Sequence, residues 1–249
     1  MKRRMLFIEP KDICDQMNLS ETEMFRQIVR FHKLIGPDMV KNKNILEIGA
    51  GNGIFSALMS LAGASSVTAM EPEAAGSSNG VVAVFKQITK RLKLNNCHLI
   101  ADTLQQSRLQ PSTYDLIVAI ASVNHWHEPA CIKLNYDVNS QNIYIALFKK
   151  CFNCLKPQGK IIISDVGRRN FFAMINATTG IKHPFAPNIE WHKHQQPKLW
   201  AALLQKAGFQ NITWKWICPP PLKFGIDKLI NNFVAAYFTA SYFLLKAQK

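Results

Sequence analysis

The sequence predicts an α/β protein with a mostly parallel sheet, and three observations support this fold class. Residues 44–72 carry the pattern of a strand, a glycine-rich turn, a helix and a second strand. Within the expected strand 114–122, residues 116–121 form a continuous apolar run, which is typical of a strand covered on both faces. Strand and helix patterns alternate from residue 44 to residue 247 without a repeat or low-complexity linker, so we expect one domain over residues 1–249.

The first turn indicates a bound nucleotide-like group. Gly49, Gly51 and Gly53 follow the first strand with one residue between each pair. Glycine lets the backbone approach a ligand closely and adopt a positive φ. The second strand ends at Glu71, where a carboxylate accepts hydrogen bonds from both hydroxyls of a ribose. A dinucleotide is disfavoured, because its G-x-G-x-x-G spacing is not the spacing of this turn.

With Glu47 before it, the turn has the sequence pattern Glu-x-Gly-x-Gly-x-Gly, which resembles motif I of the class I S-adenosylmethionine (SAM) methyltransferases. The resemblance implies a Rossmann-like sheet of seven strands, mostly parallel with an antiparallel last strand, and helices on both faces. It also implies SAM as the cofactor. The residues of this first unit that the resemblance assigns to the cofactor are Glu47, Gly49, Ala50, Gly51, Gly53, Glu71 and Pro72.

Residues 1–43 precede the sheet and predict a helical cap. Ser20 and Glu23 have the spacing of a capping box at the start of a helix. Apolar residues then recur from Met24 at helical spacing. Such a helix often lies over the cofactor pocket in the resembled family.

The third strand leads to two further cofactor residues by resemblance. A helix over 81–94 precedes the strand, which we expect at 98–101. In the resembled family, an acidic residue after this strand meets the exocyclic amine of adenine, and the next residue touches the ring. Asp102 and Thr103 match these positions.

The fourth strand, residues 114–122, resembles motif IV of the family. The loop 123–129 follows its carboxyl end, which is the edge where open α/β sheets bind their ligands. Residues at this place in the family contact both the cofactor and the acceptor. The resemblance therefore assigns Ser122 and Asn124 to the cofactor site.

Three histidines are candidates for a general base. Methyl transfer to a hydroxyl or an ammonium group requires removal of a proton, and histidine titrates near neutral pH. His125 and His127 follow the fourth strand, where the transferred methyl group is expected to point. His192 lies in a later insertion and could reach the same pocket. We rank His125 first, His127 second and His192 third.

The C-terminal half is expected to complete the sheet and to add an insertion. The turn LKPQG before a strand at 160–164 closely resembles the LKPGG turn of the family. Residues 168–197 follow this strand, and we interpret them as a lid over the acceptor site, with a purely structural loop as the alternative. The other expected elements are helices at 140–155, 198–208 and 226–238, with Ile143, Leu147 and Phe148 of the first facing inward, and strands at 211–218 and 240–247.

The net charge of +14 is concentrated in the C-terminal part of the chain. Residues 146–249 contain 15 basic and 3 acidic residues, a net charge of +12. This part of the fold faces the acceptor, so the charge favours an anionic acceptor over a neutral one. A lysine-rich solvated surface is the alternative interpretation.

The sequence predicts a cytoplasmic protein without a membrane span or a structural metal. No apolar run reaches the ~18 residues of a transmembrane helix, and the basic N-terminus lacks the apolar stretch of a secretory signal. Cys151 and Cys154 form a lone C-x-x-C pair without the second pair of a zinc site, so we expect two buried, reduced thiols on a helix. The carboxylates near the histidines also lack a three-ligand spacing, and no metal is expected.

These features together predict a SAM-dependent methyltransferase that acts on a small, anionic metabolite such as a sugar derivative or a natural-product acid. O-methylation with a histidine base is favoured over N-methylation. The residues after the fourth strand lack both the Asn/Asp-Pro-Pro-Tyr/Phe motif and a cysteine, which disfavours methylation of nucleic-acid bases. The alternatives are an RNA or tRNA methyltransferase that uses the basic half, and a non-catalytic SAM-binding partner subunit. The acceptor, the methylated atom and the oligomeric state are left open.

Overall fold

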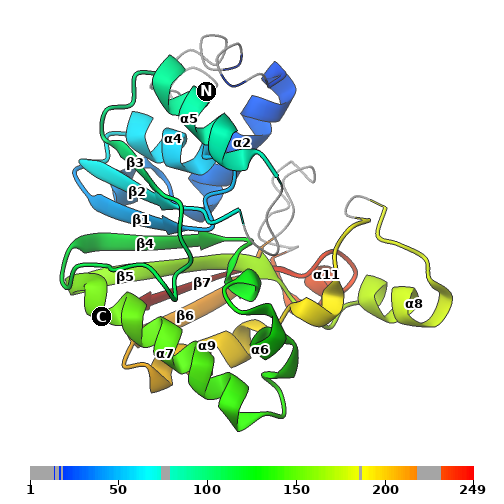
Figure 1. Cartoon of the computed structure of the whole chain (residues 1–249). Coiled ribbons are helices and arrows are strands. Elements are labelled where there is room, and N and C mark those ends of the chain that lie inside the picture. The colour runs from blue at the N-terminus through cyan, green and yellow to red at the C-terminus, as the bar shows by residue number, and fades with distance from the viewer. Residues whose placement is uncertain (1–13, 15–16, 18, 74–78, 185–186, 218–230) are drawn as a thin grey trace.

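The computed structural model describes residues 14, 17, 19–73, 79–184, 187–217 and 231–249. Within these residues, seven strands form one sheet in the order β3-β2-β1-β4-β5-β7-β6 (Figure 1). The strands are β1 (Asn44–Ile48), β2 (Ser66–Met70), β3 (Cys97–Ile100), β4 (Tyr114–Ile120), β5 (Leu155–Val166), β6 (Gln210–Trp216) and β7 (Tyr242–Gln248).

The strand directions confirm the predicted fold class. Strands β3, β2, β1, β4 and β5 run parallel to one another. Strand β7 lies between β5 and β6 and runs antiparallel to both. Strand β5 begins earlier than expected, because Leu155 already pairs with Tyr114 and the residues after it form an irregularity within the strand.

Helices cover both faces of the sheet (Figure 1). One face carries α2 (Glu21–Leu34), α4 (Ile54–Leu61) and α5 (Val81–Arg91), with the short α3 (Pro37–Val40) beside them. The other face carries α6 (Glu128–Lys133), α7 (Val138–Cys154) and α9 (Pro197–Lys206). The carboxyl ends of β1, β2 and β4 therefore open between two helical layers.

The helix signals in the sequence are largely confirmed, with one error in a facing residue. The Ser20 hydroxyl accepts a hydrogen bond from the Glu23 amide, and Glu23 accepts one from the Ser20 amide, which completes the predicted capping box of α2. On α7, Leu147 and Phe148 face inward as expected, but Ile143 is 37% exposed. Tyr144, the next residue, occupies the inward position instead and is fully buried.

The C-x-x-C pair has the predicted structural role. Cys151 and Cys154 are free, buried thiols on α7. Burial raises the pKa of the Cys154 thiol to about 11 and raises that of Cys151 well above its ordinary value. Both thiols therefore stay protonated and unreactive.

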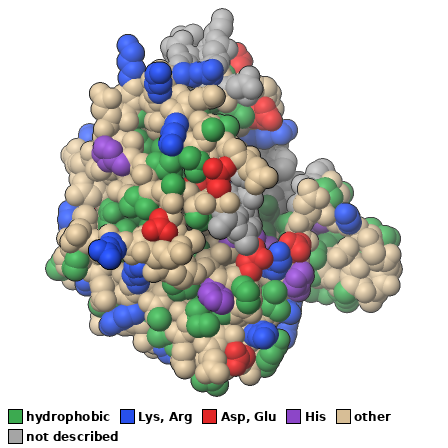
Figure 2. All heavy atoms as spheres, in the orientation of Figure 1, with side chains coloured by type: hydrophobic (Ala, Val, Ile, Leu, Met, Phe, Trp, Pro, Cys, Tyr) green, Lys and Arg blue, Asp and Glu red, His purple; other side chains and the backbone are tan. Residues whose placement is uncertain are grey.

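The insertion after β5 contains a helix that stands away from the body of the protein. Helix α8 (Phe171–Thr179) buries none of its side chains, and Met174 is 52% exposed (Figures 1 and 2). Its base contacts the segment after α11 (Phe233–Tyr237), where the rings of Phe171 and Phe238 lie 5.4 Å apart. Of the helix expected at 226–238, residues 226–230 lie outside the described residues, and the described part is helical only over α11.

The later part of the insertion returns to the body. A turn of 3-10 helix, η3 (Trp191–Lys193), contacts α6 next to the carboxyl end of β4. Within the described ranges, no helix is both long enough and apolar enough to cross a membrane.

Candidate active site

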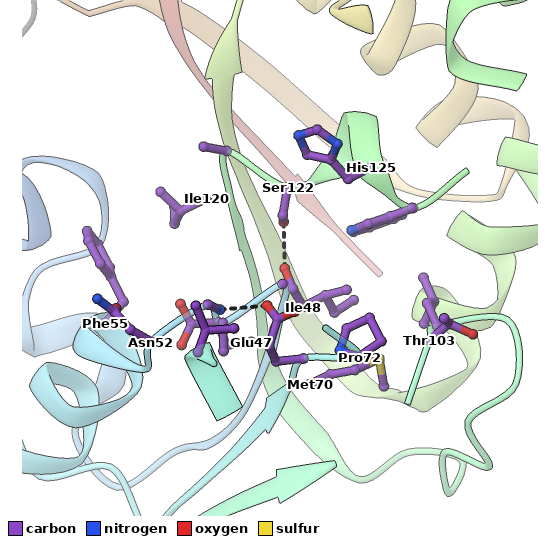
Figure 3. Close-up of a pocket in the computed structure, with 18 of the residues that line it drawn as sticks. Glu47, Ile48, Asn52, Phe55, Met70, Pro72, Thr103, Ile120, Ser122 and His125 are labelled. Atoms are coloured by element: carbon purple, nitrogen blue, oxygen red, sulfur yellow. Dashed lines mark hydrogen bonds between the residues drawn. The ribbon is translucent and has the colours of Figure 1, made fainter. Parts of the chain in front are cut away.

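A cavity of about 630 Å³ opens at the carboxyl ends of β1, β2 and β4 (Figure 3). Its wall includes the glycine turn, the end of β2, the residues after β3 and the loop after β4. Figure 3 shows Glu47, Asn52 and Phe55 toward one end of the pocket, Thr103 toward the other, and His125 above them. The predicted site residues that line the cavity are Glu47, Gly49, Ala50, Gly51, Glu71, Pro72, Asp102, Thr103, Ser122, His125 and His127.

The three glycines of the turn have different roles. Gly49 adopts a φ of 77°, and a Cβ atom there would lie 2.4 Å from the Cβ atom of Ser122. Gly53 adopts a φ of 81°, and its Cβ atom would lie 2.2 Å from the Phe85 ring. A Cβ atom on Gly51 would meet no atom within 4 Å. Gly49 and Gly53 therefore allow close packing around the turn, whereas Gly51 borders the open cavity.

The end of β4 is fastened to the glycine turn. Ala121 adopts a φ of 53°, a strained conformation for a residue with a side chain, and the strand stops at Ile120, two residues before the predicted end. The Ser122 hydroxyl then donates a hydrogen bond of 2.5 Å to the Ile48 carbonyl (Figure 3). This contact joins the predicted motif IV to the predicted motif I.

Glu71 forms part of the cavity wall as a buried carboxylate. It accepts hydrogen bonds from the backbone amides of Gly51, at 2.7 Å, and Glu73, at 3.1 Å. These contacts hold the carboxylate in place and leave acceptor positions on both oxygens, because each carboxylate oxygen accepts more than one hydrogen bond. Ribose hydroxyls fit this arrangement.

Glu47 is a second buried carboxyl group, only 3% exposed, and it accepts a hydrogen bond from the Ser56 hydroxyl. Burial raises its pKa to about 8; the Ser56 hydrogen bond opposes this increase and the charge of Glu71 adds to it. Glu47 is therefore largely protonated at neutral pH in the free protein. A cationic ligand group nearby favours its ionised form.

The opposite end of the cavity contains Asp102 and Thr103. Asp102 accepts a 2.8 Å hydrogen bond from the Thr103 amide, which fixes the carboxylate after β3. Trp126 lines the same cavity, and within the described part of the chain its indole N–H has no hydrogen-bond partner. Sequence reasoning missed Trp126, although its place between two candidate histidines was a usable signal.

His125 is held by polar contacts on both ring nitrogens. It ends the short helix η2 (Val123–His125) after β4. Its Nδ1 atom lies 2.6 Å from Glu128 Oε1, and its Nε2 atom lies 3.1 Å from Asn124 Nδ2. Burial raises the pKa of Glu128, but hydrogen bonds from Lys193 and His125 outweigh burial and hold that pKa below its ordinary value. An ionised carboxylate therefore lies beside the ring.

The other histidines have different surroundings. His127 lines the cavity, but its Nδ1 atom accepts a 3.1 Å hydrogen bond from the Ala130 amide and caps α6. His192 is exposed on η3 and does not line the cavity. Asn124 is buried, and Gly53, the last glycine of the turn, packs against Phe85; neither residue lines the cavity.

Helix α2 supplies two lining residues that the sequence did not reveal, Gln27 and Arg30. The Arg30 guanidinium lies 5.5 Å from the centre of the Phe55 ring. Among the described residues no carboxylate lies within ion-pair distance of Arg30; burial lowers its pKa, and the charge of Asp165 is among the interactions that oppose this decrease. The helix was expected near the pocket, and the i, i+3 spacing of two polar residues on its buried side was the available signal.

No group of three or more His, Cys, Asp or Glu side chains suited to a metal occurs in the ranges that the structure describes.

Three features define the class I SAM-dependent methyltransferase fold: the order of the strands in the sheet, the glycine turn against a buried carboxylate, and the pocket at the carboxyl edge of the sheet. A family model described as a methyltransferase domain matches residues 20–213. The chain belongs to this family, which confirms the resemblance predicted from its motifs and SAM as the cofactor of its class.

Sequence relatives are named as O-methyltransferases. The chain is 25% identical over 172 residues to the ubiquinone biosynthesis O-methyltransferase of Photobacterium profundum, an alignment that spans 68% of this chain and 64% of that protein. It is 22% identical over 171 residues to the Pseudomonas putida protein of the same name, spanning 68% and 65%. The aligned region thus covers slightly less than two thirds of these relatives.

Solved structures share the fold. A SAM-dependent methyltransferase from Aquifex aeolicus superposes with a TM-score of 0.56 at 14% identity, over 97% of this chain and 98% of that one. A phosphoethanolamine-type N-methyltransferase from Haemonchus contortus superposes with a TM-score of 0.59 at 15% identity, over 97% and 60%. At this identity, the similarity establishes the fold alone.

Proposed function

We propose that this protein transfers the methyl group of SAM to a hydroxyl group of a small, anionic metabolite, with His125 as the general base. One observation carries the proposal: the same cavity is lined by the glycine turn with Glu71 and by His125, whose ring is hydrogen-bonded to the Glu128 carboxylate. The relatives named as O-methyltransferases support oxygen as the methylated atom.

The residues of the cavity suit the parts of the cofactor. Glu71 would accept hydrogen bonds from the ribose, and Asp102 with Thr103 would contact the adenine. The open face at Gly51 leaves room for the amino-acid part of the cofactor. Arg30 lies near Phe55 and therefore at the same end of the cavity as Glu47. There it would form an ion pair with the carboxylate of the cofactor.

When bound, SAM supplies an electrophilic methyl group for an in-line displacement. The protein aligns the acceptor and removes its proton. In this proposal, His125 Nε2 takes the proton of the acceptor hydroxyl, and the resulting imidazolium keeps its Nδ1 proton hydrogen-bonded to ionised Glu128. The acceptor must first displace the Asn124 amide, which occupies the Nε2 position.

The anionic character of the acceptor rests on charge. Residues 146–249 carry a net charge of +12. Arg168 and Arg169 follow β5, whereas Lys193 is already ion-paired with Glu128 and Glu190. We propose that residues 168–197 form one side of the acceptor site, so that the two arginines attract an anionic group toward it.

Two measurements test the function. Calorimetry must show binding of SAM and of its demethylated product S-adenosylhomocysteine; absence of both would reject the cofactor site. Transfer from methyl-labelled SAM to a panel of hydroxylated carboxylic acids tests the reaction, and His125→Gln should abolish transfer while keeping SAM affinity. Salt-sensitive binding of bulk tRNA tighter than about 1 µM at physiological salt would instead favour the RNA alternative.

A further inference from the structure

We propose that Lys193 is a positioning residue for His125: by binding Glu128, it determines which ring nitrogen of His125 carries the proton. This inference rests on the proposed function, because it concerns the base of that reaction. It assigns a task to the insertion that differs from a lid.

An unbroken line of polar contacts runs from the cavity to the insertion. His125 Nδ1 lies 2.6 Å from Glu128 Oε1, and Glu128 Oε2 lies 2.9 Å from Lys193 Nζ. Lys193 Nζ also lies 2.7 Å from Glu190 Oε2. The two oxygens of Glu128 therefore serve different partners, one on the loop after β4 and one on η3.

The contacts of His125 specify one tautomer. Ionised Glu128 only accepts hydrogen bonds, so the 2.6 Å contact requires a proton on Nδ1. The Nε2 atom then carries a lone pair, and the Asn124 amide at 3.1 Å donates to it. A general base needs a ring nitrogen free of a proton, and this tautomer leaves Nε2 in that state.

Lys193 keeps Glu128 in the state that this tautomer requires. Burial favours the neutral form of Glu128, and the hydrogen bond from Lys193 is the first of the contacts that oppose it. Without Lys193, the carboxylate would lose one of the two contacts that orient it and would more readily turn away from the ring. Nδ1 would then lose its hydrogen-bond acceptor, and the single ring proton of His125 could move to Nε2.

The main chain around Lys193 is fixed to α6. The Cys131 thiol donates a 3.1 Å hydrogen bond to the Lys193 carbonyl. Gln195 Nε2 donates a 2.5 Å hydrogen bond to the Cys131 carbonyl, and Asn135 donates one of 2.6 Å to Gln195. Because α6 begins at Glu128, these contacts fix the main chain of Lys193 relative to Glu128.

The test reads the tautomer of His125 directly. Long-range ¹H–¹⁵N correlation spectra of histidine-labelled protein, at a pH where histidine is neutral, distinguish the two ring nitrogens. The signals of His125 are those absent from His125→Gln. We expect wild type to show Nδ1–H, and Lys193→Met and Lys193→Gln to shift the tautomer ratio toward Nε2–H by about tenfold, the scale of one charge-assisted hydrogen bond. Lys193→Arg should keep the wild-type tautomer.

The controls separate positioning from general damage. Lys182→Met changes an exposed lysine of the same insertion and should leave the His125 signals unchanged. Circular dichroism and SAM calorimetry must match wild type for each variant that is interpreted. If either folded Lys193 variant keeps His125 in the Nδ1–H form, the inference is wrong. Failure of wild type to bind SAM would reject the proposed function, while the tautomer result would still decide the role of Lys193.

Discussion

Replacing Glu47 with glutamine should remove a strong pH dependence from the stability of the free protein. Burial raises the pKa of Glu47 from 4.5 to about 8. Between these values the folded protein keeps a proton that the unfolded chain has released. Stability therefore falls as the pH rises, at about 1.4 kcal/mol per pH unit from this group.

The magnitude follows from the width of this interval. A difference of 4.5 against about 8 corresponds to a loss on the order of 5 kcal/mol across the range. The loss is fully present only above pH 8. Glutamine is neutral at every pH, has nearly the same volume, and its carbonyl oxygen can still accept the hydrogen bond from Ser56.

Urea unfolding followed by tryptophan fluorescence, without SAM, measures the effect at several pH values from 5 to 8.5. The stability of Glu47→Gln relative to wild type should rise by several kcal/mol across this range. Glu21→Gln, at an exposed position on α2, should follow the wild-type curve and serves as the control. A constant difference between Glu47→Gln and wild type would refute a protonated Glu47 in the free protein.

Three further predictions concern ligand binding and the turn. In the proposed binding mode the ammonium group of SAM would lie near Glu47, so binding at pH 7 should release a proton. Calorimetry in buffers of different ionisation enthalpy should show this release in wild type but not in Glu47→Gln. Gly49→Ala should lower stability by roughly 2–4 kcal/mol in urea unfolding, because a Cβ atom there would collide with Ser122 in addition to the cost of the positive φ. Gly51→Ala also has a positive φ but meets no atom, so it should lower stability by only about 1 kcal/mol and mainly weaken SAM binding; equal stability of the two variants would show that the collision with Ser122 has no cost. Arg30→Met should weaken SAM binding about tenfold or more without a loss of thermal stability, and unchanged affinity would show that Arg30 serves another group.

Local patterns in the sequence predicted most of the fold. The capping box of α2 and the apolar run of β4 are short-range signals, and both have the expected structure. The glycine turn was read from spacing alone, but the separate roles of Gly49 and Gly53 depend on Ser122 and Phe85. These neighbours come from distant parts of the chain, so no pattern within the turn could indicate them.

The candidate site was predictable only in part, for the same physical reason. His125 follows a strand end, and strand ends are visible in the sequence. Its link to Lys193 joins residues on separate elements, and neither residue carries a local sign of the other. Arg30 enters the cavity through the packing of α2, and His192 is exposed because η3 presents Trp191 to the interior instead.

The position of β7 has a consequence for how the chain folds. Among the strands that the structure describes, β6 pairs with β7 alone, and residues 217–241 separate the two strands in the sequence. During synthesis β6 therefore emerges before β7, the strand with which it pairs. The edge of β5 also stays unpaired until β7 has been synthesised. Such non-local pairing slows folding and leaves open edges that invite aggregation. A chain truncated before residue 242 should therefore fold its cofactor-binding part but leave β5 and β6 with unpaired edges. Such a chain should stay bound to chaperones without losing its helices.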